Sequence, residues 1–362
     1  MVVFPLFVTL FFTSIMHEGQ PLHMPVGVVD NDNTSTTRQM VRRLDAFQTT
    51  AVTGHYATVA EARHAMQRNE IYAFIYFPEG TTASLMAMRQ PKISFYYSNT
   101  SLTAGSLLYR DLRTITTLGA AAAVSQVLAA KGLTERQVMA QLQPVAIDLH
   151  PVNNPSVNYS VFLNAMLVPG CLLLLIFLVT PYSLGMELKN NTAAEWIGTA
   201  GNRPMVALVG KLLPYTMVFL AVMYGYMGYT FGVLSYPCTG GAGSLLLLGL
   251  LAVLAAQGFG VFMFGLMPTL RMSISVCSLW AVLSFSMVGT AFPVSAMSPA
   301  LQALAWLFPL RHYYLVYQLV VFNGYGLSSA YPYLMALVVF ALLPLLVAVR
   351  IKRAMVTFNY MP

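Results

Sequence analysis

Charge is scarce in this chain and almost absent from its second half. Of the 31 charged side chains, 21 lie in the first 158 residues and only ten in the remaining 204. Four long stretches hold no Asp, Glu, Lys or Arg: 149–186, 212–270, 272–310 and 312–349. Because a charge at the centre of a bilayer costs about 2.5–3.5 kcal/mol, such stretches indicate membrane spans. A mean hydropathy of +0.66 with 9% charged residues excludes an ordinary soluble domain.

Cysteine and the common catalytic motifs are also missing or rare. Cys171, Cys238 and Cys277 lie far apart and fit neither a metal site nor a disulfide framework. The chain lacks the G-x-x-x-x-G-K-[ST] loop that cradles nucleotide phosphates, and its six histidines form no H-E-x-x-H motif. The sequence therefore predicts no catalytic residue, no metal site and no cofactor bound by this chain. We expect a protein that is not itself an enzyme.

The few charged residues after position 158 indicate the membrane topology of the second half of the chain. We expect a first span at 1–16, whose cytoplasmic lead-in is missing or very short, and later spans near 160–184, 206–234, 244–267, 272–292 and 329–349. If six spans alternate, seven of the eight basic residues after position 158 lie on one side, and Arg311 is the exception. The positive-inside rule makes that side cytoplasmic. The net charge of +7 thus reflects membrane topology and does not indicate a nucleic-acid partner.

Residues 17–158 are predicted to form a mixed α/β domain on the outer side, inserted between the first and second membrane helices. Strand patterns occur at 26–29, 71–77 and 93–97, with a further strand at 144–150. Helices are expected at 36–46 and 102–130, and capping boxes begin at Thr58 and Thr134. Asp30-x-Asp32 faintly resembles a calcium loop, but the chemistry of an Asx turn fits these residues better.

Residues 159–362 are predicted to form a five-helix transmembrane domain. It contains a cytoplasmic loop at 187–204 and, at 293–310, a segment rich in helix-breaking residues. Leu301 to Leu310 is apolar, so this segment forms either a short hairpin in the outer leaflet or a plain interfacial loop. The residues that mark the hairpin are Phe292, Pro293, Pro299 and Pro309.

Several of these features occur together in one known family. Glu187-Leu188-Lys189-Asn190-Asn191-Thr192, Arg203-Pro204 and Gly210-Lys211 resemble the loop between spans two and three of ABC type-2 exporter permeases. Phe292-Pro293, Met297-Ser298-Pro299, Pro309 and Phe322-Asn323-Gly324 resemble the segments around their last span. Val28-Val29-Asp30-Asn31-Asp32 resembles the start of the large extracytoplasmic domain of the multidrug-type branch. The chain departs from the family at Asn191, where the E-x-x-x-G-T element usually has glycine.

The resemblance implies the permease subunit of an ATP-driven exporter in a bacterial cytoplasmic membrane. Two permeases, identical or related, would pair among membrane lipids. Each would dock on a separate ABC ATPase subunit that binds ATP and Mg²⁺, and a periplasmic adaptor is a further expected partner. The resemblance assigns coupling to the ATPase to Glu187, Lys189, Thr192, Glu195 and Arg203.

Substrate would pass between spans two and five of the two halves. Helix packing remains the alternative role for each residue predicted to line that path, since small and polar residues serve helix contacts in membranes. These residues are Asn164, Pro169, Ser284, Ser286 and Thr290.

Two other functions remain open. The chain could be a membrane-anchored receptor or envelope-assembly factor that acts through its outer domain. A secondary carrier is the weakest reading, because no later span has an ionisable residue near its middle. The substrate is open among drugs, lipids, glycans and small peptides.

Overall fold

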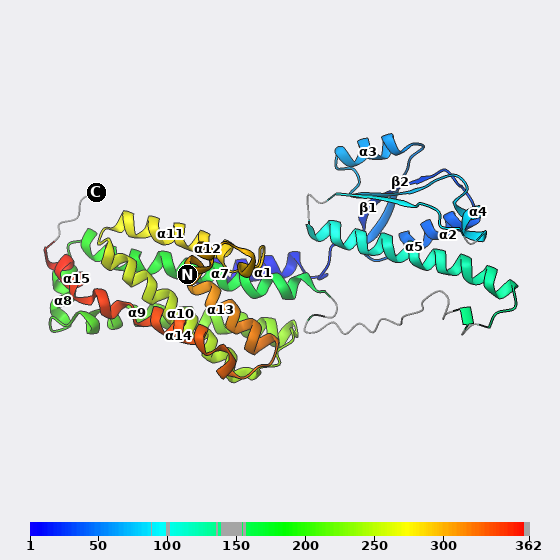
Figure 1. The fold of residues 1–362 in the computed structure, drawn as a ribbon. Coiled ribbons are helices and arrows are strands. Elements are labelled where there is room, and N and C mark those ends of the chain that lie inside the picture. The colour runs from blue at the N-terminus through cyan, green and yellow to red at the C-terminus, as the bar shows by residue number, and fades with distance from the viewer. Residues whose placement is uncertain (88, 99–101, 135–136, 139–153, 155–156, 358–362) are drawn as a thin grey trace. The chain divides into compact units, whose positions relative to one another are not determined.

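The computed structural model describes residues 1–87, 89–98, 102–134, 137–138, 154 and 157–357. It divides into two compact units, which we call the helical unit (1–19 with 151–362) and the α/β unit (20–150). Figure 1 shows the elements of each. The expected return strand at 144–150 lies outside the described residues.

The helical unit follows the predicted spans closely. The five later spans correspond to α7, α9 with the π-helical turn η1, α10, α11 and α14 with α15. The elements in chain order are α1 (Val3–Ile15), α7 (Tyr159–Lys189), α8 (Ala193–Thr199), α9 (Pro204–Met227), η1 (Gly228–Val233), α10 (Gly241–Leu266), α11 (Leu270–Met287), η2 (Val294–Ala296), α12 (Pro299–Ala305), α13 (Pro309–Val316), η3 (Tyr317–Phe322), η4 (Leu327–Ala330), α14 (Tyr331–Leu342) and α15 (Pro344–Thr357).

Six described helices are long and apolar enough to cross a membrane, but they are not the six that the sequence predicts. The five later spans are among them. The sixth is Thr103–Ala130, which belongs to the α/β unit, whereas α1, the expected first span, is a shorter apolar helix. At 13 residues α1 is about 20 Å long, less than the roughly 30 Å of a hydrocarbon core.

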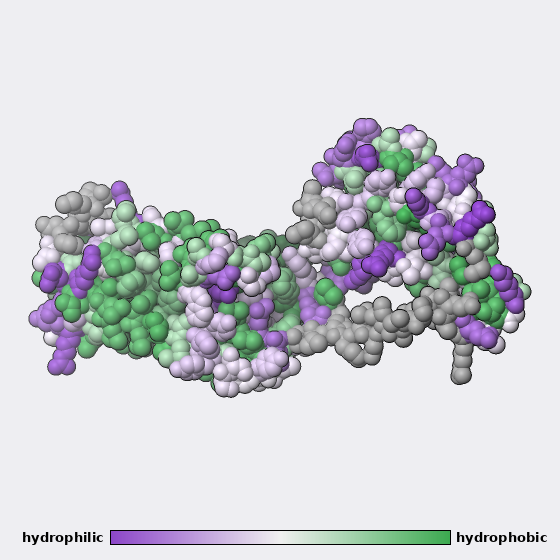
Figure 2. Space-filling model, in the orientation of Figure 1, coloured by the Kyte–Doolittle hydropathy of each residue, from purple (hydrophilic) through white to green (hydrophobic). Residues whose placement is uncertain are grey.

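The core of the helical unit is built around α10. Buried apolar residues of α7, α9, α10, α11 and α13 form one continuous cluster. A Cβ atom at Gly258 would lie 2.2 Å from the Phe340 carbonyl oxygen, so glycine lets α10 approach α14 closely. Figure 2 shows hydrophobic side chains over the middle of this unit and hydrophilic ones at the end where Figure 1 places α8 and α15. This distribution is the one that a bilayer selects.

The predicted hairpin region is partly helical. Residues 293–310 contain the 3₁₀ turn η2 and the short helix α12, and Gln302 Nε2 donates to the Met297 carbonyl oxygen at 2.9 Å. The sequence did not predict that 309–322 continue as α13 and η3, a buried helical segment in the core of the unit. His312, which is fully buried, bonds through Nε2 to the Trp306 carbonyl oxygen at 2.8 Å.

The α/β unit contains a four-stranded sheet in the order β2-β1-β3-β4. The first three strands are parallel and β4 is antiparallel to β3. Helices α2 and α5 pack on one face and α3 on the other. The elements are β1 (Met24–Asp30), α2 (Ser35–Asp45), β2 (Thr50–His55), α3 (Val59–Gln67), β3 (Ala73–Phe77), α4 (Thr81–Met86), β4 (Ser94–Tyr97) and α5 (Leu102–Ala130).

The Asp30–Asp32 segment is the turn that the sequence favoured. Asp30 Oδ1 accepts hydrogen bonds from the backbone N–H groups of Asp32 (3.2 Å) and Asn33 (2.9 Å). Asp32 Oδ2 accepts from the backbone N–H (3.1 Å) and the hydroxyl (2.6 Å) of Thr82. Partial burial acts to raise the pKa of Asp32, but the bonds from Thr82 and Thr34 outweigh it and hold that pKa below its usual value. Asp30 therefore closes the turn after β1, and Asp32 ties that turn to Thr82 of α4.

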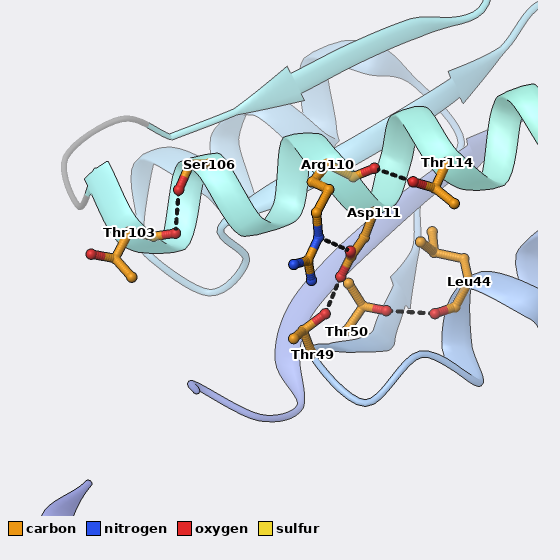
Figure 3. A network of polar contacts seen from close by, with 8 residues as sticks. All are labelled: Leu44, Thr49, Thr50, Thr103, Ser106, Arg110, Asp111 and Thr114. Carbon is orange, nitrogen blue, oxygen red and sulfur yellow. Dashed lines mark hydrogen bonds and ion pairs between the residues drawn. The ribbon is translucent and has the colours of Figure 1, made fainter. Parts of the chain in front are cut away.

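A polar network ties α5 to the start of β2 (Figure 3). The carboxylate of Asp111, only 5% exposed, accepts a hydrogen bond from the Thr49 hydroxyl and pairs with Arg110 Nε at 3.0 Å. Thr50 beside it donates to the Leu44 carbonyl oxygen at the end of α2. The network fixes α5 where the chain enters the sheet edge.

We expect Asp111→Ala to lower the free energy of unfolding of the α/β unit by about 1–3 kcal/mol, because it leaves the buried Thr49 hydroxyl without its acceptor. Urea-dependent pulse proteolysis of the full-length protein, scored at sites within 20–150, measures the change. Thr114→Ala on the exposed side of α5 is the control and should stay within about 0.5 kcal/mol of the parent. Equal stability of the two variants would contradict the role given to Asp111.

Candidate functional site

The best-defined polar site of the helical unit is the loop that joins α7 to α9. Helix α7 ends at Lys189 with Asn190 as its C-cap, and Asn191 has a φ of +57°, in the left-handed region. Glycine adopts this conformation most easily and asparagine is among the few other residues that tolerate it. The reversal lets the backbone N–H of Thr192 bond the Glu187 carbonyl oxygen at 3.0 Å. Asn191 therefore serves the turn for which the resembled family uses glycine.

Glu187 braces this loop against the next membrane helix. Its carboxylate accepts a hydrogen bond from the Thr192 hydroxyl and forms an ion pair with Lys211 on α9. The two charged side chains are only 19% and 17% exposed. Lys211 Nζ also lies 5.7 Å from the ring centroid of Trp196 on α8, a cation–π distance. One carboxylate thus connects α7, the turn before α8, and α9.

Helix α8 is held by its apolar side. Ala193 and Ile197 are buried in a cluster with residues of α7, α9, α10 and α15. After α8 the chain turns through Gly201 and Asn202, with φ values of +62° and +60°, and α9 begins at Pro204. Lys352 Nζ of α15 donates to the Asn202 carbonyl oxygen at 2.8 Å, which secures the return turn.

The structure separates the five predicted coupling residues into two groups. Glu187 and Thr192 are half-buried and bonded to each other, so they shape the loop. Lys189, Glu195 and Arg203 are exposed and available to another protein. Next to them, a shallow hollow of about 320 Å³ lies between α8 and α9, walled by Trp196, Ala200, Val206 and Lys211.

Sequence reasoning did not assign a role here to Trp196 or Lys352, and it named Lys211 only as part of a motif. Of these three residues, only Lys211 could have been recognised from the sequence, because it is a lone basic residue about two turns inside an apolar helix. A charge in that place needs a partner, and the two acidic residues of the preceding loop, Glu187 and Glu195, are the candidates. Trp196 and Lys352 carried no comparable signal.

The predicted path residues lie on or near the packed surfaces of α7 and α11. Asn164, Pro169 and Ser284 are buried inside the single chain. Asn164 Nδ2 donates to Ser160 Oγ (3.0 Å) and Tyr236 Oη (3.2 Å), and Ser284 Oγ donates to the Trp280 carbonyl oxygen (2.7 Å).

Beyond these three, Ser286 is exposed and Thr290 is half-buried, with its hydroxyl 3.1 Å from Met166 Sδ. The assignment of a path to all five stays a prediction.

Long apolar helices whose basic residues gather mostly at one end define a multi-pass membrane protein. The sequence profile of the ABC-2 family transporter protein matches residues 1–350, and the chain belongs to this family. The resemblance seen in the sequence is thereby confirmed. A search of curated proteins found no match to the chain.

We expect Glu187→Lys and Lys211→Glu each to destabilise the helical unit by on the order of 2 kcal/mol, because each leaves two like charges in a partly buried place. The double exchange Glu187→Lys with Lys211→Glu should recover much of the loss, although not the contribution of Lys211 to Trp196. Thermal unfolding of the purified full-length protein measures all four stabilities.

Lys189→Glu is the matched control, since Lys189 is exposed and two residues from Glu187. It should change stability by no more than about 0.5 kcal/mol. If the double exchange were as unstable as the sum of the single variants, the ion pair would not be the interaction that holds this loop.

Proposed function

We propose that this chain is the permease subunit of an ATP-driven exporter that moves a hydrophobic or amphiphilic substrate out of the cytoplasm or inner leaflet. Membership of the ABC-2 family supports a transport subunit that works with an ABC ATPase. The proposal places ATP and Mg²⁺ on that partner, and the chain itself lacks the phosphate-binding loop. A second permease, identical or related, completes the translocation unit.

The observation that carries the coupling role is the geometry of α8. Its inner side is fixed by Ala193 and Ile197 and by the Glu187 brace, whereas Glu195 points away from the bundle as an exposed residue. A short helix packed against several membrane helices can transmit a push on its outer face to them. An ATPase docked on Glu195, Lys189 and Arg203 would move α7 and α9 together.

The proposed orientation follows the basic residues. Lys189, Arg203, Lys211, Arg271, Arg350, Lys352 and Arg353 share one side if the spans alternate, which places them in the cytoplasm. Residues 17–158 are then extracytoplasmic, inserted between the first two helices. A bacterial cytoplasmic membrane fits this arrangement, with the outer domain gating exit or engaging a periplasmic adaptor.

We expect Glu195→Arg to reduce export and recovery of the ATPase at least tenfold, because it reverses charge on the exposed face of α8 without touching the brace. Affinity purification of the full-length protein from its native membranes, followed by mass spectrometry and a transport assay, measures both. The permease ratio in the same sample distinguishes a homodimer from a heterodimer.

Glu18→Arg makes the same charge change on an exposed residue of the predicted outer side and should leave export and ATPase recovery at parental levels. Export at the parental level by Glu195→Arg would remove α8 from the coupling role. Repeated recovery of the parent without any protein carrying a phosphate-binding loop would reject the exporter itself.

One feature favours a second function, a receptor or envelope-assembly factor. The α/β unit has a cavity of about 390 Å³ where β1 and β2 end, near Asp30, Arg38, Arg42 and His55. In open α/β sheets, ligands commonly bind outside the carboxyl ends of the strands. Ligand binding by the full-length protein that Arg38→Ala with Arg42→Ala abolishes, in a protein that purifies without an ATPase, would favour this function.

A further inference from the structure

A second cavity lies within the membrane-spanning part of the helical unit, apart from the α7–α11 surfaces. It has a volume of about 240 Å³ and is lined by α9, α10 and the junction of α14 with α15. Its lining side chains are apolar except for Thr216 and Gln257. An engineered apolar cavity of about 150 Å³ in another protein binds benzene, so this one is large enough for a ring or several methylene groups.

Gln257 is the unusual residue of this cavity. It is 4% exposed, and its Oε1 atom accepts a hydrogen bond from the Thr216 hydroxyl at 2.8 Å. Its Nε2 atom has no hydrogen-bond partner among the described residues. A buried amide donor without a partner is costly, and it is more so among hydrocarbon chains, which offer no acceptor.

Thr216 contacts only the Oε1 atom of the amide, so it supplies no acceptor for Nε2. Its oxygen also lies 2.9 Å from the Leu212 carbonyl oxygen, and the hydroxyl has one hydrogen to share between the two acceptors. The Nε2 donor of Gln257 therefore needs an acceptor that the described residues do not provide. A carbonyl oxygen is the simplest group that is an acceptor only.

The helix break at the cavity shapes its third wall. Pro344 starts α15 and has no N–H group, and Leu343 separates α15 from α14. Leu342 and Leu345, on the two sides of the break, line the cavity and are 52% and 56% exposed. Val209 and Leu213 on α9 line it as well and are 58% and 54% exposed. These apolar residues make a mouth that opens on the lipid-facing surface.

The depth of Gln257 in the membrane indicates which ligands can reach its amide, because the ester carbonyl groups of an ordinary phospholipid lie nearer the surface. Gln257 lies nine residues before Leu266, the end of α10, which is about 13 Å along a helix. The mouth residues of α9 lie in its first half and the cavity residues of α10 lie in its second half, which are the halves nearest Arg203 and Arg271. An acceptor that reaches Gln257 must therefore lie within the hydrocarbon, below the depth of glycerol esters.

We propose that this cavity binds a single-chain amphiphile from the leaflet next to the basic loops, with its alkyl chain among α9, α10 and α14–α15 and an internal carbonyl oxygen accepting from Gln257 Nε2. The site requires the membrane placement of the helices but not the proposed coupling to an ATPase. This binding site, open toward the lipid, is separate from the substrate path that was predicted between α7 and α11.

The test uses the full-length protein in nanodiscs of dioleoylphosphatidylcholine with two photoreactive probes. Both carry a diazirine on a chain of equal length, and one has a mid-chain ketone while the other is a plain alkane. After irradiation, mass spectrometry locates and counts the adducts. We expect the ketone probe to label α9, α10 and α14–α15 about fivefold more than the alkane probe, the factor that one neutral hydrogen bond provides.

Gln257→Leu should bring the labelling ratio to about one while keeping alkane labelling, because it removes the donor and preserves the apolar volume. Gln302→Leu removes an amide from α12, outside the cavity, and should keep the parental ratio. Leu254→Trp fills the cavity and should reduce labelling by both probes.

Equal labelling of the parent by the two probes would mean that ordinary lipid tails fill the cavity, and it would overturn the proposal. A preference for the ketone that survives Gln257→Leu, or adducts that lie elsewhere in the parent, would overturn it as well. Because no ATPase is present in the nanodiscs, failure here and failure of the exporter assignment are separate results.

Discussion

The constraint on which the helical unit depends is that hydrocarbon neither solvates charge nor offers hydrogen-bond partners. It accounts for the four uncharged stretches and for the gathering of basic residues at the ends of helices. It also explains why the loop after α7 is built around an ion pair. Glu187 and Lys211 lie close to the helix ends, where each alone would be poorly solvated, and together they satisfy one another. The same pair that makes the charges tolerable also fixes α8.

That dual role connects stability to the proposed function. A coupling element has to move as a body, because a push that merely bends a loop is lost before it reaches the membrane helices. Helix α8 has apolar anchors in Ala193 and Ile197, a charged brace in Glu187, and a return turn held by Lys352. Its inner contacts belong to several membrane helices, so displacement of α8 displaces them. The residues that shape the loop and the residues free to meet a partner are different ones.

The sequence was informative where composition alone decides the structure. The later spans are long and uncharged, and β1, β3 and β4 have apolar, β-branched or aromatic runs. Strand β2 was missed because Thr50–His55 contains a glycine and a histidine and alternates weakly, and its pairing with β1 supplies what its composition lacks. The buried segment 309–322 was missed because Arg311 and His312 break its hydropathy. The contact between Trp196 and Lys211 could not be predicted, because it depends on the geometry of a turn that composition does not specify.

Helix α5 shows a second limit of reasoning from composition, because its composition alone would also allow a membrane span. Thr103–Ala130 meets a length and hydropathy criterion for a span, yet Leu108, Leu112 and Ile115 are buried against the sheet. Seven of its 28 residues are alanine, which is only mildly apolar and common in soluble helices. Asp111 on the same helix is buried and paired with Thr49 and Arg110, a bonding pattern suited to a protein interior.

Two buried amides in the helical unit illustrate how burial and bonding together separate structural from binding groups. Asn164 donates from Nδ2 to Ser160 and Tyr236, and only its side-chain oxygen Oδ1 has no partner among the described residues. An under-used carbonyl oxygen is the commoner and cheaper exception in proteins. Gln257 has the opposite arrangement: its side-chain oxygen is bonded, and its Nε2 donor, beside an apolar cavity, has no partner in the described part of the chain. The first amide completes a network within the chain, whereas the second is left to be completed by a ligand, which is why burial alone does not assign Asn164 to a path.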